Sequence, residues 1–193
     1  INGGNVYAQS ALGTAIGGGS SQTINGGNAN VTITGGSVVA KSLPVGNIPA
    51  GAGIGGGTGG SNDGANGGSA TVTISGNPII RTGSIGGGKT NNSMGTIGSA
   101  QINISGGDIQ AQFVMAAGAA SKPSFTMSGG LIRNSDTEDK DYVLIQENGG
   151  AVYLEDGTFE MTGGEIRQCL AEKGGAIYIK GSTETTFKMS GGK

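Results

Sequence analysis

One six-residue motif recurs along almost the whole chain and constrains the fold more than any other feature. Its pattern is an apolar residue, any residue, an apolar residue, serine or threonine, and then two glycines, the second of which is Asn77 in one copy. The copies occupy residues 31–36, 72–77, 102–107, 125–130, 159–164 and 187–192. They follow one another at spacings of roughly 23 to 41 residues, which indicates stacked structural units rather than one globular core.

Each copy of the motif predicts a short β-strand followed by a tight corner. In residues 31–34 apolar and hydroxyl side chains alternate, which is the period of a strand with one buried face. The glycine pair permits a close backbone turn. A second apolar stretch follows the corner, as in residues 37–40 and 108–111. A third element contains Ile16, Ile54 and Ile85 in the first half, and residues 149–154 and 174–179 in the second.

Strand, corner and strand in repeated order predict an all-β fold, a right-handed parallel β-helix (solenoid). We expect about six to seven coils with three short strands per coil. The right hand follows from the general preference of parallel crossovers. Equivalent residues of successive coils should then stack into ladders. One ladder would contain Val31, Val72, Ile102, Phe125, Phe159 and Phe187, and the other Ile33, Ile74, Ile104, Met127, Met161 and Met189.

Composition agrees with a narrow interior. Of 193 residues 43 are glycine and only 4% are aromatic, which is too little large apolar material for an ordinary two-layer core. We expect residues 1–193 to be a single β-helix fragment of a longer protein. Residues 1–120 would form glycine-rich coils, and residues 121–193 more charged and bulkier ones. The Gly/Ser/Asn-rich stretch 57–69 is predicted to be a loop that interrupts the repeat.

Several strings resemble the repeats of large bacterial surface proteins related to the pectate-lyase-like β-helix superfamily. They are Gly-Ala-Gly-Ile-Gly-Gly-Gly at 51–57, Val-Thr-Ile-Ser-Gly at 72–76, Phe-Glu-Met-Thr-Gly-Gly at 159–164 and Gly-Gly-Ala-Ile-Tyr-Ile at 174–179. Such proteins are often described as adhesin-like or carbohydrate-binding. The resemblance implies a secreted protein of the bacterial cell surface, with a glycan or a host surface protein as partner. It implies no particular activity, because one fold hosts many functions.

Two groups of residues are candidate ligand-binding sites. Tyr153 and Tyr178 occupy the same position of successive units and could form an exposed aromatic surface for a glycan; the alternative is that they cover the flank of the helix. The second group is the acidic cluster Asp136, Glu138, Asp139 and Asp141. These carboxylates could bind Ca²⁺, although their spacing is not that of an EF-hand, and a solvated polar loop is the alternative.

Catalytic chemistry finds little support in the sequence. A glycosidase needs paired carboxylates, for which Glu147, Glu155, Asp156 and Glu160 are the candidates. The chain has no histidine and no Asp-Asp pair. Arg133 and Arg167 stand at matching positions, but the acidic calcium ligands of a lyase site are not beside them, so an outward arginine ladder near Glu165 is expected. We therefore assign no catalytic residue, no cofactor and no metal site.

Charge excludes one class of partner. The net charge is −2 with no basic face, which argues against nucleic acid. No apolar run approaches the ~18 residues of a membrane span, so no membrane insertion is expected of this fragment.

Three hypotheses for function remain. The first is a non-catalytic structural or adhesive module that presents loops to glycan or host protein. The second is part of a carbohydrate-active β-helix enzyme, a polysaccharide lyase or glycoside hydrolase. The third is a self-assembling extracellular structural protein, because the open ends of a β-helix are unpaired strand edges that could join end to end.

Overall fold

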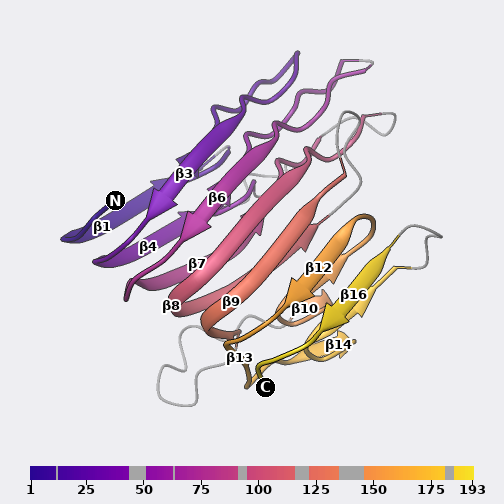
Figure 1. Cartoon of the computed structure of the whole chain (residues 1–193). Helices are drawn as coiled ribbons and strands as arrows, with labels where there is room; N and C mark the ends of the chain where they lie inside the picture. The colour runs from indigo at the N-terminus through magenta and orange to yellow at the C-terminus, as the bar shows by residue number, and fades with distance from the viewer. Residues whose placement is uncertain are drawn as a thin grey trace.

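The computed structural model of the chain describes residues 1–11, 13–43, 51–62, 64–90, 95–115, 122–134, 146–180 and 185–193. These residues form strands, turns and bends, with no helix among them (Figure 1). The strands are β1 (Asn5–Ser10), β2 (Ile16–Gly17), β3 (Ala29–Ile33), β4 (Ser37–Ser42), β5 (Ile54–Gly55), β6 (Ala70–Ile74), β7 (Ile79–Gly86), β8 (Ala100–Met115), β9 (Ser124–Arg133), β10 (Gln146–Asn148), β11 (Val152–Leu154), β12 (Thr158–Met161), β13 (Glu165–Ile166), β14 (Ala171–Lys173), β15 (Ile177–Ile179) and β16 (Thr186–Met189).

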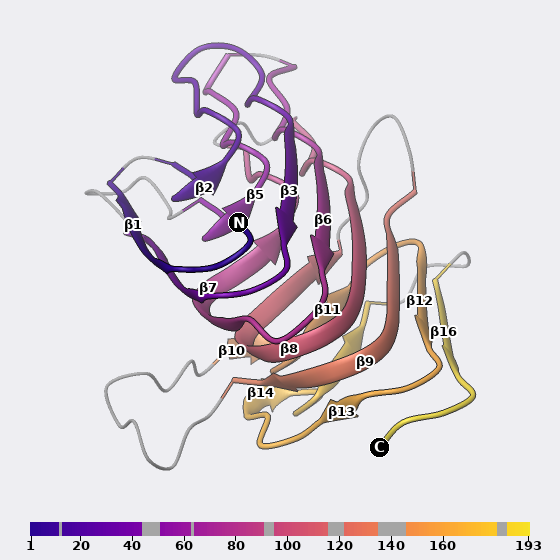
Figure 2. The same ribbon diagram turned by 60° about the vertical axis from the view of Figure 1, so that its left-hand side comes forward.

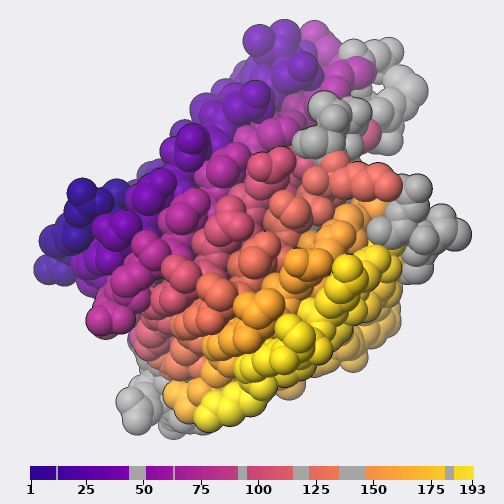
Figure 3. All heavy atoms as spheres, viewed as in Figure 1, coloured from indigo at the N-terminus to yellow at the C-terminus, as the bar shows by residue number. Residues whose placement is uncertain are grey.

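The strands pair in parallel. Among the described residues, β10 and β14 form a sheet of two strands, and the other 14 strands form one large sheet. The main path of the large sheet is β1-β4-β7-β8-β9-β12-β16, which follows the order of the chain. Each pair of neighbours on this path is parallel. Figure 2 shows the chain bending the same way at successive corners, and Figure 3 shows successive stretches as bands that lie side by side across the surface. The expected all-β class with parallel pairing is therefore confirmed.

The motif strands pair residue upon equivalent residue, as the sequence predicts. Val31 pairs with Val72, and Val72 pairs in turn with Ile102. Ile102 pairs with Phe125, and the ladder continues through Phe159 to Phe187. The second ladder, from Ile33 to Met189, keeps the same register in every pairing. Both predicted ladders are confirmed.

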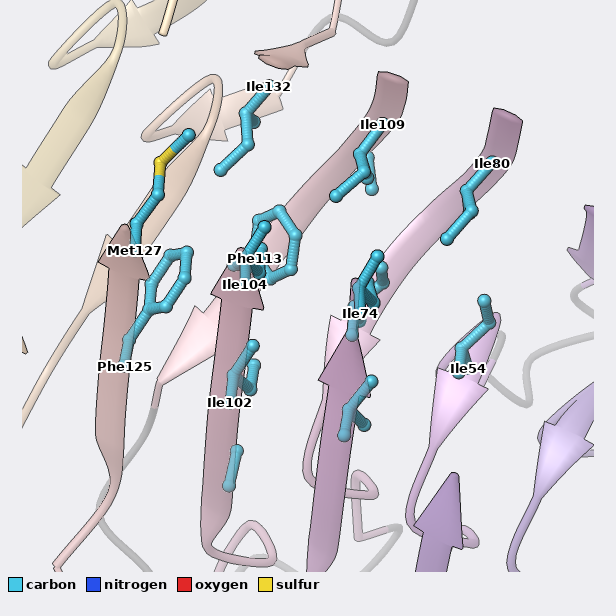
Figure 4. Close-up of a cluster of buried hydrophobic side chains, with 14 of the residues drawn as sticks. Ile54, Ile74, Ile80, Ile102, Ile104, Ile109, Phe113, Phe125, Met127 and Ile132 are labelled. Atoms are coloured by element: carbon cyan, nitrogen blue, oxygen red, sulfur yellow. The ribbon is translucent and has the colours of Figure 1, made fainter. Parts of the chain in front are cut away.

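The interior is a column of stacked apolar side chains. These are mainly aliphatic in the first half of the chain, and phenylalanines join them in the second half. In Figure 4 isoleucines from β7, β8 and β9 face the motif ladders across the core. The row consists of Ile80, Ile109 and Ile132, each 0% exposed. Further along, the buried rings of Phe125 and Phe159 stack with centroids 4.4 Å apart at 10°. Phe113 from the end of β8 stacks on Phe125 at 4.9 Å, so the aromatic stack draws on two faces of the structure.

The glycine corners adopt the backbone conformation that the motif requires. At Gly130 φ is +88°, in the left-handed region that favours glycine. The preceding residue, Gly129, is equally constrained, because a Cβ there would lie 2.6 Å from the carbonyl oxygen of Ser105 in the neighbouring corner. Two glycines are thus needed for different reasons, one for conformation and one for close approach.

A column of hydrogen-bonded glycines fills the part of the structure that the sequence assigns to a loop. Each member donates its backbone N–H to the carbonyl oxygen of the one before it, at 2.7 to 2.9 Å. This glycine column runs Gly19, Gly27, Gly57, Gly68, Gly88 and Gly98. Gly57 and Gly68, inside the predicted loop 57–69, are buried. The stretch lacks regular strands, but it is a packed part of the structure rather than an excursion from it.

Close backbone contact explains why these positions are glycine. A Cβ on Gly68 would lie 1.9 Å from the carbonyl oxygen of Gly27, and one on Gly88 would lie 1.9 Å from that of Gly57. No side chain fits between segments that approach so closely. The large glycine content is therefore a packing requirement in this region.

We expect Gly68→Ala to lower the free energy of unfolding by about 2 to 3 kcal/mol, because the new methyl group overlaps a backbone oxygen that cannot move without breaking the column. Gly19→Ala is the matched control in the same column, since a Cβ there meets nothing within 4 Å. It should change stability by less than about 0.5 kcal/mol. Urea unfolding measures both, and equal midpoints for the two variants would contradict the close packing of the column.

Candidate functional site

The two candidate tyrosines stack on the outside of the structure. Val152 and Leu154 of β11 are buried, so strand alternation directs Tyr153 between them outward. Tyr153 pairs in register with Tyr178 of β15. Their ring centroids are 5.7 Å apart with planes 16° from parallel, and both residues are half-buried. The two rings thus form a stack on the outer side of the strands, and their half-burial agrees with both arrangements that the sequence left open.

Charged groups border this stack. The Tyr153 hydroxyl donates a hydrogen bond to Glu155 Oε2 at 3.1 Å, and Lys180 Nζ donates to Glu155 Oε1 at 2.5 Å. We call Tyr153, Tyr178, Glu155 and Lys180 the tyrosine cluster. Burial raises the pKa of Tyr153, and the charge and hydrogen bond of Glu155 raise it further. The hydrogen bond to Glu155, followed by the influence of Tyr153, raises the pKa of Lys180.

The stack determines which parts of the rings can meet a ligand. One face of the Tyr153 ring stacks on Tyr178, and the strand neighbour of Tyr153 on its other side is Val114 of β8. A saccharide could use the accessible part of the stacked rings for its C–H groups and the Glu155–Lys180 pair for its hydroxyls.

The acidic cluster Asp136, Glu138, Asp139 and Asp141 lies outside the described residues. Within the residues that are described, no group of three or more histidine, cysteine, aspartate or glutamate side chains could hold a metal ion.

The four carboxylates considered for glycosidase chemistry each have a partner of their own. Glu147 pairs with Lys173 at 3.6 Å, and Glu160 pairs with Lys188 at 3.4 Å. Asp156 accepts a hydrogen bond from the backbone N–H of its neighbour Gly157 at 2.8 Å. Glu155 belongs to the tyrosine cluster. Each of the four carboxylates is thus engaged by a different group.

The expected arginine ladder beside Glu165 is half wrong. Arg167 does pair with Glu165, at 3.7 Å. Arg133, however, binds Asp108 through two hydrogen bonds, Nε to Oδ1 at 3.0 Å and Nη2 to Oδ2 at 2.9 Å. Arg81 reaches the same carboxylate from the other side at 3.8 Å. One carboxylate between two arginines is a more favourable arrangement than like charges stacked on like.

Sequence reasoning missed Asp108, although a signal existed. Asp108 directly follows a glycine corner and is in register with Ile79 before it and Leu131 after it. Arg81 and Arg133 each stand two residues beyond those partners. A parallel strand presents such diagonal neighbours to one another on the same face.

Asp108 also borders a shallow groove along the glycine corners. The groove has a volume of about 500 Å³ and crosses three successive corners. It exists because the glycines have no side chains while the residues flanking them do. Its side-chain lining includes Asn77, Pro78, Ile79, Ser105, Asp108 and Leu131. Ile79 is 46% exposed, so the groove combines an apolar wall with polar groups.

Comparison with known proteins gives no relative: no family model, no curated protein and no solved structure matches the chain. The described residues also include no helix with the length and hydrophobicity that crossing a bilayer requires.

We expect Tyr153 to titrate above the ordinary tyrosine pKa, and Glu155→Gln to bring that pKa down. Loss of a proton makes the phenol anionic, so a nearby carboxylate and burial both oppose it; removing the carboxylate removes one cause and leaves the other. NMR titration of ring-labelled tyrosine follows each residue separately. Glu160→Gln, an ion-paired glutamate on β12, is the control and should leave Tyr153 unchanged. A Tyr153 pKa that ignores Glu155→Gln would contradict the hydrogen bond.

Proposed function

We propose that the chain is a right-handed parallel β-helix of about six to seven coils, a single unit over residues 1–193. The in-register parallel ladders support this architecture, because each motif strand between β3 and β16 pairs with the equivalent strands of the unit before it and the unit after it. Main-chain hydrogen bonding of this kind makes a stiff rod. In this proposal the rod holds the side chains on its lateral faces, such as the tyrosine cluster, at fixed positions.

In our proposal the chain is a non-catalytic structural and adhesive module of a secreted bacterial cell-surface protein, and its partner is a glycan. The tyrosine cluster is the feature of the structure that supports a glycan as the ligand. It combines two stacked, half-buried aromatic rings on the outer side of the strands with a carboxylate and an ammonium group that bind each other. A saccharide packs its C–H groups against aromatic rings and forms hydrogen bonds from its hydroxyls to charged side chains, and the tyrosine cluster offers both.

The corner groove offers a second lateral surface for the same class of ligand. Exposed Ile79 provides an apolar wall, and Asn77 and Ser105 provide hydrogen-bonding groups. The Asp108 carboxylate is paired with Arg81 and Arg133. We therefore give it a structural role at the border of the groove and not a catalytic one.

We expect the chain to bind a subset of saccharides on a glycan array, and Tyr178→Ala to weaken that binding about tenfold or more. Tyr7→Ala is the control, because Tyr7 is also exposed, at 65%, but lies on β1 away from the cluster. Loss of binding with Asn77→Ala instead would move the site to the corner groove.

Two outcomes would refute the proposal. If no saccharide binds while a protein from a host surface does, the adhesive module recognises protein. If a bound polysaccharide is cleaved, and the reducing ends produced are lost with Glu155→Gln and Arg167→Gln, the chain is part of a carbohydrate-active enzyme.

A further inference from the structure

A second cavity has a lining of its own, separate from the residues of the two surfaces described above. Its volume is about 200 Å³, and it is bordered by β4, β7, β8 and the segment after β7. Its lining includes Ser42, Gly53, Gly83, Ser84, Lys89 and Gln112. None of these residues belongs to the tyrosine cluster or the corner groove.

Lys89 is the charged residue of this cavity, and its backbone is held in place. It directly follows Gly88 of the glycine column, and its carbonyl oxygen accepts a hydrogen bond from the backbone N–H of Gly59 at 2.8 Å. The residue is half-buried. Burial lowers the pKa of Lys89, because removal from water disfavours the ammonium form.

Among the residues that the structure describes, the ammonium group of Lys89 makes neither a hydrogen bond nor an ion pair, whereas Lys173, Lys180, Lys188 and Lys193 each pair with a glutamate. Lys89 also lies in a stretch of low charge, because residues 64–107 contain no aspartate or glutamate. The first one after this stretch, Asp108, is engaged by two arginines.

The polar groups around Lys89 are oriented. Gln112 donates both hydrogens of its amide, to the carbonyl oxygens of Asn148 and Gly149 at 2.7 Å each, which leaves its oxygen as an acceptor. The Ser42 hydroxyl donates to the carbonyl oxygen of Gly13. The Ser84 hydroxyl bonds to none of the described residues and can donate. The cavity therefore offers one cation and one hydroxyl donor beside fixed acceptors.

We propose that this cavity binds a small oxyanion, a carboxylate or a sulfate group, with the Lys89 ammonium as its counter-charge and the Ser84 hydroxyl as a second donor. A charge-assisted hydrogen bond to a lysine withdrawn from water is among the stronger polar interactions in proteins. The Gln112 oxygen accepts from a hydroxyl on the same ligand. The proposal does not depend on glycan binding at the tyrosine cluster.

The size of the cavity limits the ligand. At about 30 Å³ per water molecule, 200 Å³ corresponds to roughly six or seven waters. That volume takes an acidic group with a short chain or a single ring attached. Acidic groups of this kind occur as free anions or on acidic sugars, and both share the chemistry that Lys89 would recognise.

NMR titration of the ¹⁵N-labelled chain tests the site, with sodium sulfate and sodium acetate added at constant ionic strength against sodium chloride. We expect saturable shifts of the Ser84 and Lys89 amide signals with at least one oxyanion. Lys89→Gln should weaken binding about tenfold or more. Lys173→Gln, which removes an exposed lysine elsewhere, is the control. Shifts that never saturate, or that survive Lys89→Gln, would overturn the proposal.

A steric variant tests the position of the ligand independently of charge. Gly83 lines the cavity, and a Cβ there meets nothing within 4 Å, so Gly83→Val should fill the space without disturbing the backbone. It should abolish oxyanion binding while the remaining amide spectrum stays that of the native chain. Undiminished binding to Gly83→Val would place the anion elsewhere.

A third measurement needs no substitution. Saturating oxyanion should raise the pKa of Lys89, followed through its side-chain resonances, because a bound anion favours the ammonium form. An unchanged Lys89 pKa would contradict direct contact. Glucuronate and glucose 6-sulfate, compared with neutral glucose and with the free anions, then show whether the acidic group is bound alone or on a sugar.

Discussion

Parallel main-chain pairing between equivalent segments is the interaction on which the structure depends. Because every motif strand bonds to its counterpart in register, each buried apolar side chain of the motif stacks on another apolar side chain, as Val31 does on Val72. Fixing so many glycines opposes folding, since glycine loses more conformational freedom than any other residue. The opposing gain comes from hydrogen bonds and contacts that repeat at every step. A single shift of register would lose all of them together, which is why the order is strict.

Neighbouring segments are held together in two different ways along the chain. In the first part the glycine column brings backbone directly against backbone, with N–H to carbonyl bonds of 2.7 to 2.9 Å and no side chains between. In the later part side chains do the same work: phenylalanines stack inside, and oppositely charged residues in register, such as Glu160 and Lys188, meet outside. Exposed ion pairs of this kind contribute little each. The aromatic stack is therefore the larger contribution there.

Periodicity was sufficient to predict what periodic side chains build. The alternation in residues 31–34 and its recurrences gave strand, corner and register, and the matching positions of Tyr153 and Tyr178 gave their stack. Glycine carries no such pattern, so residues 57–69 read as a loop although Gly57 and Gly68 are packed. The partner of Arg133 was missed for a related reason. The predicted ladders pair residues at equivalent positions of successive units, whereas Asp108 lies on the preceding strand, diagonal to Arg133.

Scarcity of charge in the first half is what makes Lys89 unusual. A structure held by backbone contacts needs few charged groups, and residues 64–107 contain only Arg81 and Lys89. Arg81 reaches the Asp108 carboxylate, but Lys89 has no such group within reach among the described residues. A half-buried charge without a partner is unfavourable for folding, and an apolar or small residue would remove the penalty. Folding stability therefore does not explain why a lysine stands at position 89. The anion site that we propose, with the Ser84 hydroxyl and the oriented Gln112 amide beside the lysine, does explain it.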